Sequence, residues 1–226
     1  LIQLNSYENR VFQVFLEDGR VVVAKFYRPG RWTDAQTLEE HAFAAELGAA
    51  EIPVAVPWKL GDAADSVHRS GVSMLGPTLA EFAARTARYR FSVSERLAGR
   101  APELDDPDTL EWIGRFVGRI HAVGARARFV HRQTLDLETF GIANRDWLLG
   151  TDLIPPDALT DWRAVTERAL EAVRAAFAEG GTPRTLRLHG DCHLGNVLWA
   201  SDGPHFVDLD DAVNGPATQD LWMLLS

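Results

Sequence analysis

The sequence predicts a two-lobed α+β fold, in which a β-rich N-terminal lobe (residues 1–97) precedes a mostly helical C-terminal lobe (residues 98–226). Segments rich in Val and Phe, with the patterning of strands, dominate the first part of the chain. From Pro107 onward, apolar residues recur every three to four positions, which is the period of an amphipathic helix. Residues 98–107 hold a glycine, two prolines and two aspartates, and they mark the boundary between the two patterns.

The N-terminal lobe opens with a predicted β-hairpin, whose strands are residues 10–17 and 20–27. A helix is expected to follow, because Thr33 and Gln36 have the spacing of a capping box. Residues 52–57 carry two prolines, so this segment suits an edge strand or an extended connection rather than a central strand.

Further elements are predicted from the same kinds of pattern. Strands are expected at residues 72–75 and 91–97, and the Ala and Arg content of residues 80–90 favours a helix between them. In the C-terminal lobe, apolar periodicity predicts helices over residues 107–123 and 157–179. Short strands are expected near the end of the chain, at residues 186–188, 197–199 and 205–207.

The composition is that of a globular protein and excludes several classes of function. Of the 226 residues, 46% are hydrophobic and 24% are charged, which argues against a disordered chain. The net charge of −9 makes nucleic acid or an anionic membrane an unexpected partner. No apolar run approaches the roughly 20 residues of a membrane-spanning helix. The single cysteine, Cys192, allows no intrachain disulfide, so we expect a cytoplasmic protein. We also expect the protein to act as a monomer.

The densest group of polar side chains lies in residues 189–196 and 207–211. Asp191 offers a carboxylate and Asn196 an amide within a short loop between apolar strands. Asp208 follows 17 residues after Asp191, at the end of an apolar strand that a hairpin can return to the same place. Carboxylate and amide oxygens are hard ligands, so this group suits Mg²⁺ that carries a nucleotide phosphate.

The chain also holds the other parts that phosphoryl transfer needs, above all a lysine for the phosphates. Lys25 ends the strand-like segment 21–25, with the spacing of the lysine strand of kinases. An acid that pairs with this lysine is expected on the next helix, where both Glu39 and Glu40 stand. Glu40 is preferred because it lies one helical turn before Phe43 and so adjoins the apolar face, although the sequence leaves the choice open.

Other chemistries are less well supported by the same segment. His189, Cys192 and His193 could suggest zinc, but they are crowded within five positions and no distant cysteine completes the ligand set. Cys192 is better interpreted as a packed side chain than as a nucleophile, and His189 as a residue that braces the loop. Several tryptophans fall in apolar helical patterns and are expected in the core: Trp112, Trp162 and Trp222.

Residues 189–196 together with residues 207–208 resemble the catalytic loop and metal motif of the aminoglycoside phosphotransferase and choline kinase-like branch of the protein-kinase-like fold. A closer resemblance is to the bacterial stress response kinase A subfamily, whose members are cytoplasmic Ser/Thr protein kinases. The segments that carry this resemblance are residues 4–12, 24–29, 38–41, 186–193, 207–211, 215–216 and 220–225.

The resemblance implies a role for each matching residue of the C-terminal lobe. Asp191 would act as the catalytic base, and Asn196 and Asp208 would be the ligands of Mg²⁺. Asp220 would be a buried acid that braces the catalytic loop. Lys25, on the N-terminal side, would orient the phosphates of ATP.

The nucleotide would be held by a turn and a hinge. Ser6 would belong to the turn that covers the phosphates. Because this turn lacks the glycines of the usual Gly-rich loop, Ser6 and Asn9 are expected to supply hydrogen bonds in their place. The backbone at residues 94–97, which includes Glu95 and Leu97, would hydrogen-bond the adenine.

The resemblance weakens at residues 60–90 and 143–184. Members of the subfamily continue beyond both ends of the printed sequence, which starts at Leu1 rather than at methionine and stops inside the apolar run 221–225. We therefore expect the C-terminal lobe to be incomplete, with part of the substrate-binding surface outside residues 1–226.

The sequence thus predicts transfer of the γ-phosphoryl group of ATP to a hydroxyl, with Mg²⁺ as cofactor. The resemblance implies a Ser or Thr of a protein as the acceptor, in a bacterial stress response. Two alternatives stay open. One is a small-molecule kinase acting on an aminoglycoside, choline or homoserine-like alcohol, for which the acidic charge would help to attract a cation. The other is a nucleotide-binding pseudokinase scaffold.

Overall fold

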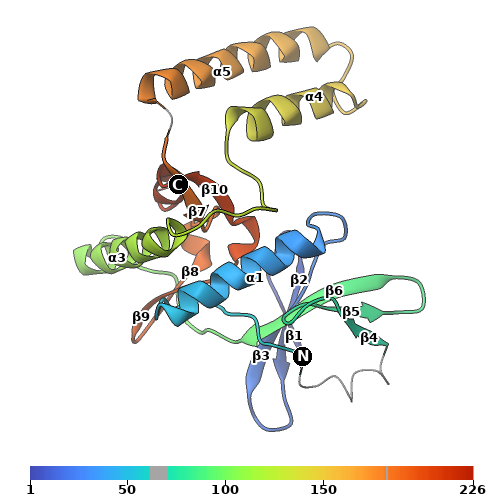
Figure 1. The fold of residues 1–226 in the computed structure, drawn as a ribbon, viewed down its shortest axis with the longest axis vertical. Helices are drawn as coiled ribbons and strands as arrows, with labels where there is room; N and C mark the ends of the chain where they lie inside the picture. The colour runs from blue at the N-terminus through green and yellow to red at the C-terminus, as the bar shows by residue number, and fades with distance from the viewer. Residues whose placement is uncertain (62–70, 182, 226) are drawn as a thin grey trace.

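The computed structural model describes residues 1–61, 71–181 and 183–225 (Figure 1). A six-stranded sheet and helix α1 (Asp34–Ala49) form its N-terminal part, and helices with two small ladders form the rest. The predicted α+β class is confirmed. The last strand of the large sheet ends at Glu95 and the next helix begins at Pro107, while the division into lobes at residue 97 stays a prediction.

The large sheet is antiparallel throughout, in the order β1-β2-β3-β6-β5-β4. Its strands are β1 (Ile2–Leu4), β2 (Arg10–Phe15), β3 (Val21–Phe26), β4 (Val72–Met74), β5 (Ala80–Ala83) and β6 (Arg88–Glu95). Lys25 on β3 pairs with Val11 of β2 on one side and with Ser92 of β6 on the other. The strand that carries the lysine therefore lies between the strand that follows the predicted phosphate turn and the strand that leads to the predicted hinge.

The predicted hairpin is confirmed as β2 and β3. Gly19 stands in the turn with φ of +86°, in the left-handed region that glycine adopts without strain. The predicted extended segment at residues 52–57 is also present, since Val54 bridges Phe206 and Pro57 bridges Ser94. The predicted strand at residues 72–75 corresponds to β4.

The helix predicted at residues 80–90 is wrong, because these residues form β5, a tight turn and the start of β6. The Ala84 N–H donates to the Ala87 carbonyl at 2.9 Å, which closes the turn. Across the ladder Phe82 pairs with Tyr89. The helix preference of Ala and Arg amounts to less than about 1 kcal/mol per residue, so backbone bonds to neighbouring strands outweigh it.

Helix α1 begins at the predicted capping box. The Thr33 hydroxyl accepts the Gln36 N–H at 3.3 Å, and the Gln36 side chain accepts the Thr33 N–H at 2.9 Å. On its buried face, Phe43 and Leu47 enter the main core, where they pack with residues of the C-terminal part such as Phe129. Helix α1 thus connects the sheet to the rest of the molecule, and Figure 1 shows it between them.

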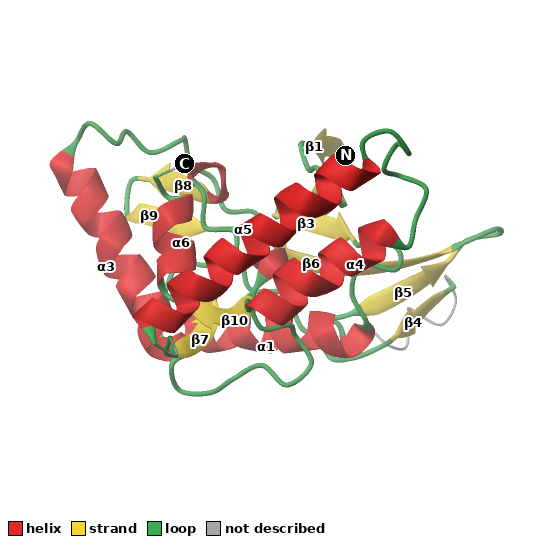
Figure 2. Cartoon of the chain, turned by 90° about the horizontal axis from the view of Figure 1, so that it is seen from above, coloured by secondary structure: helices red, strands yellow, loops and turns green. Residues whose placement is uncertain are grey.

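The C-terminal part supplies helices and two short ladders (Figure 2). The helices predicted at residues 107–123 and 157–179 are confirmed as α3 (Pro107–Gly124) and α5 (Leu159–Gly180). No helix in the described part of the chain is both long and apolar enough to cross a membrane. The remaining elements are the π-helix η2 (Leu137–Ile142), α4 (Ala143–Leu149), β7 (Thr185–Leu188), the 3₁₀ turn η3 (Leu194–Asn196), β8 (Val197–Ala200), β9 (Gly203–Phe206), the 3₁₀ turn η4 (Leu209–Asp211), β10 (Val213–Pro216) and α6 (Thr218–Met223).

Two of the tryptophans expected in the core are exposed. Trp112 on α3 and Trp222 on α6 keep about half of their surface in contact with solvent. Helix α5 likewise buries only Leu170 among its residues. Figure 1 shows α4 and α5 side by side at the end of the molecule opposite the sheet. Apolar periodicity indicates which face of a helix is apolar, but it does not show whether another element covers that face.

Phe43 provides a test of the core that joins the two parts. Its side chain is fully buried and meets Phe129 edge to face at 5.4 Å. We expect Phe43→Ala to lower the free energy of unfolding by about 3–5 kcal/mol. Phe15→Ala, at an exposed phenylalanine of β2, is the matched control and should cost less than about 1 kcal/mol. Urea unfolding measures both, and equal losses would contradict the assignment of the core.

Candidate active site

A cleft with a volume of about 320 Å³ lies between the sheet and the C-terminal elements. Most of the site residues predicted from the sequence line it: Ser6, Lys25, Glu40, Glu95, Leu97, Asn196 and Asp208. A second cavity of about 410 Å³ is lined by Asp191 together with Trp32, Phe140 and Gln219. The loop that runs from Gly190 to Asn196 contributes to both cavities.

Lys25 lies in the cleft next to two carboxylates. Its Nζ is 2.6 Å from Asp208 Oδ1 and 3.1 Å from Asp210 Oδ1. It also lies 5.6 Å from the centre of the Tyr27 ring. Burial by itself lowers the pKa of Lys25, but the negative charges of Asp210 and Asp208 outweigh this effect and raise the pKa above its usual value. Lys25 is therefore a cation in the ligand-free site.

The two adjacent glutamates of α1, Glu39 and Glu40, have different surroundings. The Glu39 carboxylate accepts the backbone N–H groups of Val130, His131 and Arg132 at 2.5, 2.9 and 2.9 Å, outside the cleft. Glu40 is buried and lines the cleft, although it makes no ion pair with Lys25 within 4.0 Å. Burial raises the pKa of Glu40 to about 7, against the opposing effect of the Lys25 charge.

A buried acid organises the loop that carries Asp191. Asp220 accepts the backbone N–H groups of His189 and Gly190 at 3.1 and 2.9 Å. His121 Nε2 of α3 lies 2.9 Å from the same carboxylate. The His189 ring donates to the Val207 carbonyl at 3.0 Å, which ties the loop to the segment before Asp208. Asp220 and His189 thus occupy the bracing positions expected from the sequence.

Gly190 must be glycine in this arrangement. Its φ is +88°, and a Cβ atom would stand 2.0 Å from the Asp211 carbonyl oxygen. The close approach brings the loop before Asp191 against the segment after Asp208.

Asp191 and Asn196 face each other across the loop. The Asn196 amide nitrogen donates to the Asp191 carbonyl at 2.9 Å and lies 3.2 Å from Asp191 Oδ2. The Asp191 side chain keeps 34% of its surface exposed. Its carboxylate is thus held from one side and open toward the second cavity.

The donors for a metal ion fit Mg²⁺. Asp208 stands in the left-handed region, with φ of +62°, and its carboxylate lines the cleft together with Asn196. The amide nitrogen of Asn196 is occupied by Asp191, which leaves the amide oxygen to accept a ligand. One carboxylate and one amide oxygen form a hard, incomplete set, as expected where phosphate oxygens and water complete the coordination of Mg²⁺.

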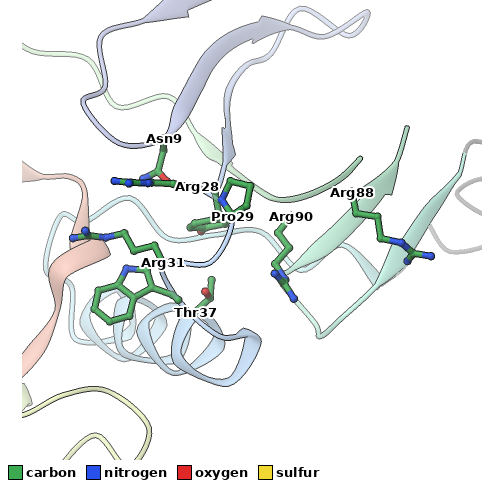
Figure 3. A pocket seen from close by; sticks show the side chains of 9 residues that line it. Asn9, Arg28, Pro29, Arg31, Thr37, Arg88 and Arg90 are labelled. Atoms are coloured by element: carbon green, nitrogen blue, oxygen red, sulfur yellow. The ribbon is translucent and has the colours of Figure 1, made fainter. Parts of the chain in front are cut away.

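Asn9 is the predicted nucleotide-binding residue that the structure places outside the cleft. Its side chain donates to Asp210 Oδ2 at 2.6 Å and accepts the Arg28 N–H at 3.0 Å. It lines a small pocket with Arg28, Arg31 and other residues of the β3–α1 region (Figure 3). The pocket volume of about 20 Å³ is close to that of a single water site. Ser6 lines the cleft, and its hydroxyl accepts the backbone N–H of Asn9 at 3.2 Å. Of Ser6 and Asn9, only Ser6 is therefore open to a ligand in the cleft.

Two buried charged residues of the site were not singled out as site residues from the sequence, although Asp210 lies in the polar group of residues 207–211. Asp210 contacts Lys25 and Asn9, and Arg132 donates to the carbonyls of Asp210 and Ala212 at 2.6 and 2.9 Å. Arg132 lies in an irregular segment, and its partners are about 80 positions away in the sequence. No local pattern could have indicated it.

Cys192, within the loop from Gly190 to Asn196, is buried. Burial raises the pKa of its thiol far above the usual value, and the charges of Asp220 and Asp191 act in the same direction. A thiol kept protonated in this way is a packing residue, as expected from the sequence.

The family model described as the phosphotransferase enzyme family matches residues 1–226, the whole chain. The chain belongs to the phosphotransferase enzyme family. It is 45% identical over 226 residues to "Stress response kinase A" of Escherichia coli and 43% identical over 230 residues to "Serine/threonine protein kinase RdoA" of Salmonella typhimurium. Each match covers 100% of this chain and 62% of the relative, so the chain spans less than two thirds of these proteins. The resemblance to the stress response kinase A subfamily is confirmed.

Solved structures show the same fold as this member of the phosphotransferase enzyme family. The amicoumacin kinase hAmiN, in complex with AMP-PNP, Ca²⁺ and Ami, matches with a TM-score of 0.72 and 18% identity, over 99% of this chain and 62% of that chain. A microcompartment-associated aminopropanol kinase matches with a TM-score of 0.70 and 19% identity, over 99% of this chain and 68% of that chain. The predicted kinase-like fold is confirmed.

Glu40 gives a pH-dependent prediction. Its pKa is about 7 in the folded protein and near 4.5 in an exposed carboxyl, so the folded state binds more protons between these values and loses stability as pH rises through them. We expect Glu40→Gln to remove this loss, and its stabilising effect should be about 2 kcal/mol larger at pH 8 than at pH 5.

Urea unfolding of the ligand-free protein at both pH values measures the effect. Glu39→Gln is the matched control, and it should destabilise at both pH values because the Glu39 carboxylate accepts backbone N–H groups. An effect of Glu40→Gln that is the same at pH 5 and pH 8 would show that Glu40 titrates normally.

Proposed function

We propose that the chain carries the active site of an ATP- and Mg²⁺-dependent kinase that transfers the γ-phosphoryl group to a hydroxyl. The observation that carries the proposal is the position of the loop from Gly190 to Asn196 between two cavities. On one side lie a lysine and the metal donors, and on the other an exposed carboxylate opens into a space of about 410 Å³. A donor site and an acceptor site on either side of one acid are what phosphoryl transfer requires.

In this proposal the nucleotide occupies the cleft of about 320 Å³. The backbone of residues 94–97 binds the adenine, and Ser6 and Lys25 bind the phosphates. Asn196 and Asp208 hold Mg²⁺, which would supply positive charge against the phosphate oxygens when bound. The residues that contribute to the cleft come from β3, β6, the end of the loop at Asn196 and the segment 207–209, so docking of the two parts of the molecule completes the site.

Asp191 would act as the base that accepts the proton of the acceptor hydroxyl. Its carboxylate is partly exposed, contacts the amide of Asn196, and faces the second cavity. The bracing of the loop by Asp220 keeps the carboxylate in one place without covering it. A base held in this way can orient a hydroxyl toward a phosphoryl group at low entropic cost.

The preferred acceptor is a Ser or Thr of a protein, in a bacterial stress response. The support is the whole-chain identity of 43% to a relative named a serine/threonine protein kinase. A small hydroxylated molecule is the second candidate, because the second cavity is within the size range of small-ligand pockets. We further propose that the protein acts as a monomer in the cytoplasm, in line with its single, buried cysteine.

The choice of acceptor is tested with the full-length gene product, labelled ATP and Mg²⁺. A generic protein substrate and a panel of amino alcohols are offered in parallel. We expect the label on Ser or Thr of the protein. Label on the alcohols alone would refute the protein-kinase proposal, and binding of nucleotide without any transfer would favour a scaffold.

Asp191→Asn tests the base. We expect the substitution to lower the rate of phosphoryl transfer on the order of 10²-fold or more, with little change in nucleotide affinity. Asp202→Asn is the matched control, because Asp202 is an exposed aspartate that contacts only His205 in the described structure and should leave the rate unchanged. A rate retained in Asp191→Asn would mean that another group is the base.

A further inference from the structure

The two carboxylates that contact Lys25 differ in their surroundings. The Asp208 side chain is 44% exposed, whereas the Asp210 side chain is 7% exposed. The proposed function assigns Asp208 to the metal ion, so this carboxylate must be available to a ligand other than lysine. Asp210 does not line the cleft. Of the two, Asp210 is therefore the partner that can stay with Lys25 when the nucleotide and its metal are bound.

Asp210 is held on several sides. Its Oδ1 lies 3.1 Å from Lys25 Nζ, and its Oδ2 accepts the Asn9 side-chain N–H at 2.6 Å. Its backbone carbonyl accepts the Arg132 guanidinium at 2.6 Å. A buried carboxylate with one oxygen hydrogen-bonded, the other oxygen next to a lysine and its own backbone carbonyl hydrogen-bonded is positioned more narrowly than an exposed one.

Asn9 extends this network to the phosphate turn. Its side-chain oxygen accepts the Arg28 N–H at 3.0 Å, and its own N–H donates to Ser6 at 3.2 Å. Asn9 therefore connects the turn that carries Ser6 to Asp210, and Asp210 contacts the lysine of β3. The three elements that would surround the phosphates meet at one buried carboxylate.

Glu40 has a different set of contacts. Among the described residues, the basic side chain within 4.0 Å of its carboxylate is His41, at 3.6 Å, and burial lowers the pKa of His41 to about 4, so the imidazole is neutral at neutral pH. Lys25 lies beyond this distance, although both residues line the same cleft. Helix α1 thus brings Glu40 near Lys25, but the ion pairs with Lys25 are made by Asp208 and Asp210.

We propose that Asp210 is the positioning residue for Lys25, and that through Asn9 it also sets the phosphate turn relative to the lysine. The proposal rests on the proposed function, since it assumes that Lys25 binds nucleotide phosphates. It assigns to Asp210 the role that the sequence predicted for Glu40.

The first test measures binding of ATP and of adenosine to the full chain at constant Mg²⁺. We expect Asp210→Asn to lower the affinity for ATP about tenfold or more, as for loss of a charge-assisted hydrogen bond, and to leave the affinity for adenosine unchanged. Glu40→Gln should lower ATP affinity less than Asp210→Asn does. Glu46→Gln is the matched control, because Glu46 pairs with the buried Arg187 away from the cleft.

Asn9→Ala is a second variant, which leaves the charge of Asp210 in place. It should weaken ATP binding in the same direction and by a smaller factor. Equal losses for ATP and adenosine in Asp210→Asn would indicate a merely structural role and would overturn the proposal. A larger effect of Glu40→Gln than of Asp210→Asn would also overturn it, in favour of the helix acid.

The second test is a double-mutant cycle on unfolding of the nucleotide-free protein, with Asp210→Asn and Lys25→Met. We expect the two effects to be non-additive, and additive effects would show that Asp210 does not hold Lys25. This cycle needs no nucleotide, so it separates the two proposals. If the wild-type chain binds neither ATP nor adenosine, the proposed function is wrong, and the cycle alone decides whether Asp210 positions the lysine.

Discussion

The positive charge of Lys25 is largely removed from water where the sheet meets the C-terminal elements, and the surrounding structure balances that charge. A buried ion costs several kcal/mol unless it is paired. Asp208 and Asp210 contact the lysine. Arg132, which donates to the backbone carbonyl of Asp210, adds a second cation to this group. Glu40 is buried in the same group, and burial raises its pKa to about 7 although the charges of Lys25 and Arg132 act against this rise. The acid on the helix is thus the member of the group that yields its charge most readily.

Two loops around the site are held by the same kind of contact, in which a carboxylate accepts backbone N–H groups. Irregular loops leave backbone N–H groups without partners, and a carboxylate can accept several of them at once. Asp220 accepts the N–H groups at the start of the loop that carries Asp191, and Glu39 accepts three in the segment that leads to Arg132. Both acids make loops rigid without regular secondary structure. This is why residues on loops can hold the geometry of a site.

The sequence predicted the parts of the site that depend on local pattern. Lys25 is predictable because Val-rich and Phe-rich segments joined by turn residues indicate a hairpin, and because the lysine has the spacing of the lysine strand of kinases. The polar loop around Asp191 stands out between apolar strands. The choice between Glu39 and Glu40 could not be made, because the N–H groups that draw Glu39 away belong to a segment about 90 residues later. The contact of Asn9 with Asp210 and the strand at residues 80–83 depend on tertiary pairing, which outweighs local preference.

The hydrogen bond between Asn9 and Asp210 joins residues 201 positions apart, and the contact between Lys25 and Asp208 spans 183 positions. Contacts of such separation form only after most of the intervening chain has become compact, since the entropy of closing the loop must first be offset by other interactions. The cleft that holds Lys25 and Asp208 therefore cannot exist in a chain that has folded only its first half. During synthesis on the ribosome, the cleft can form only after Asp210 has left the exit tunnel.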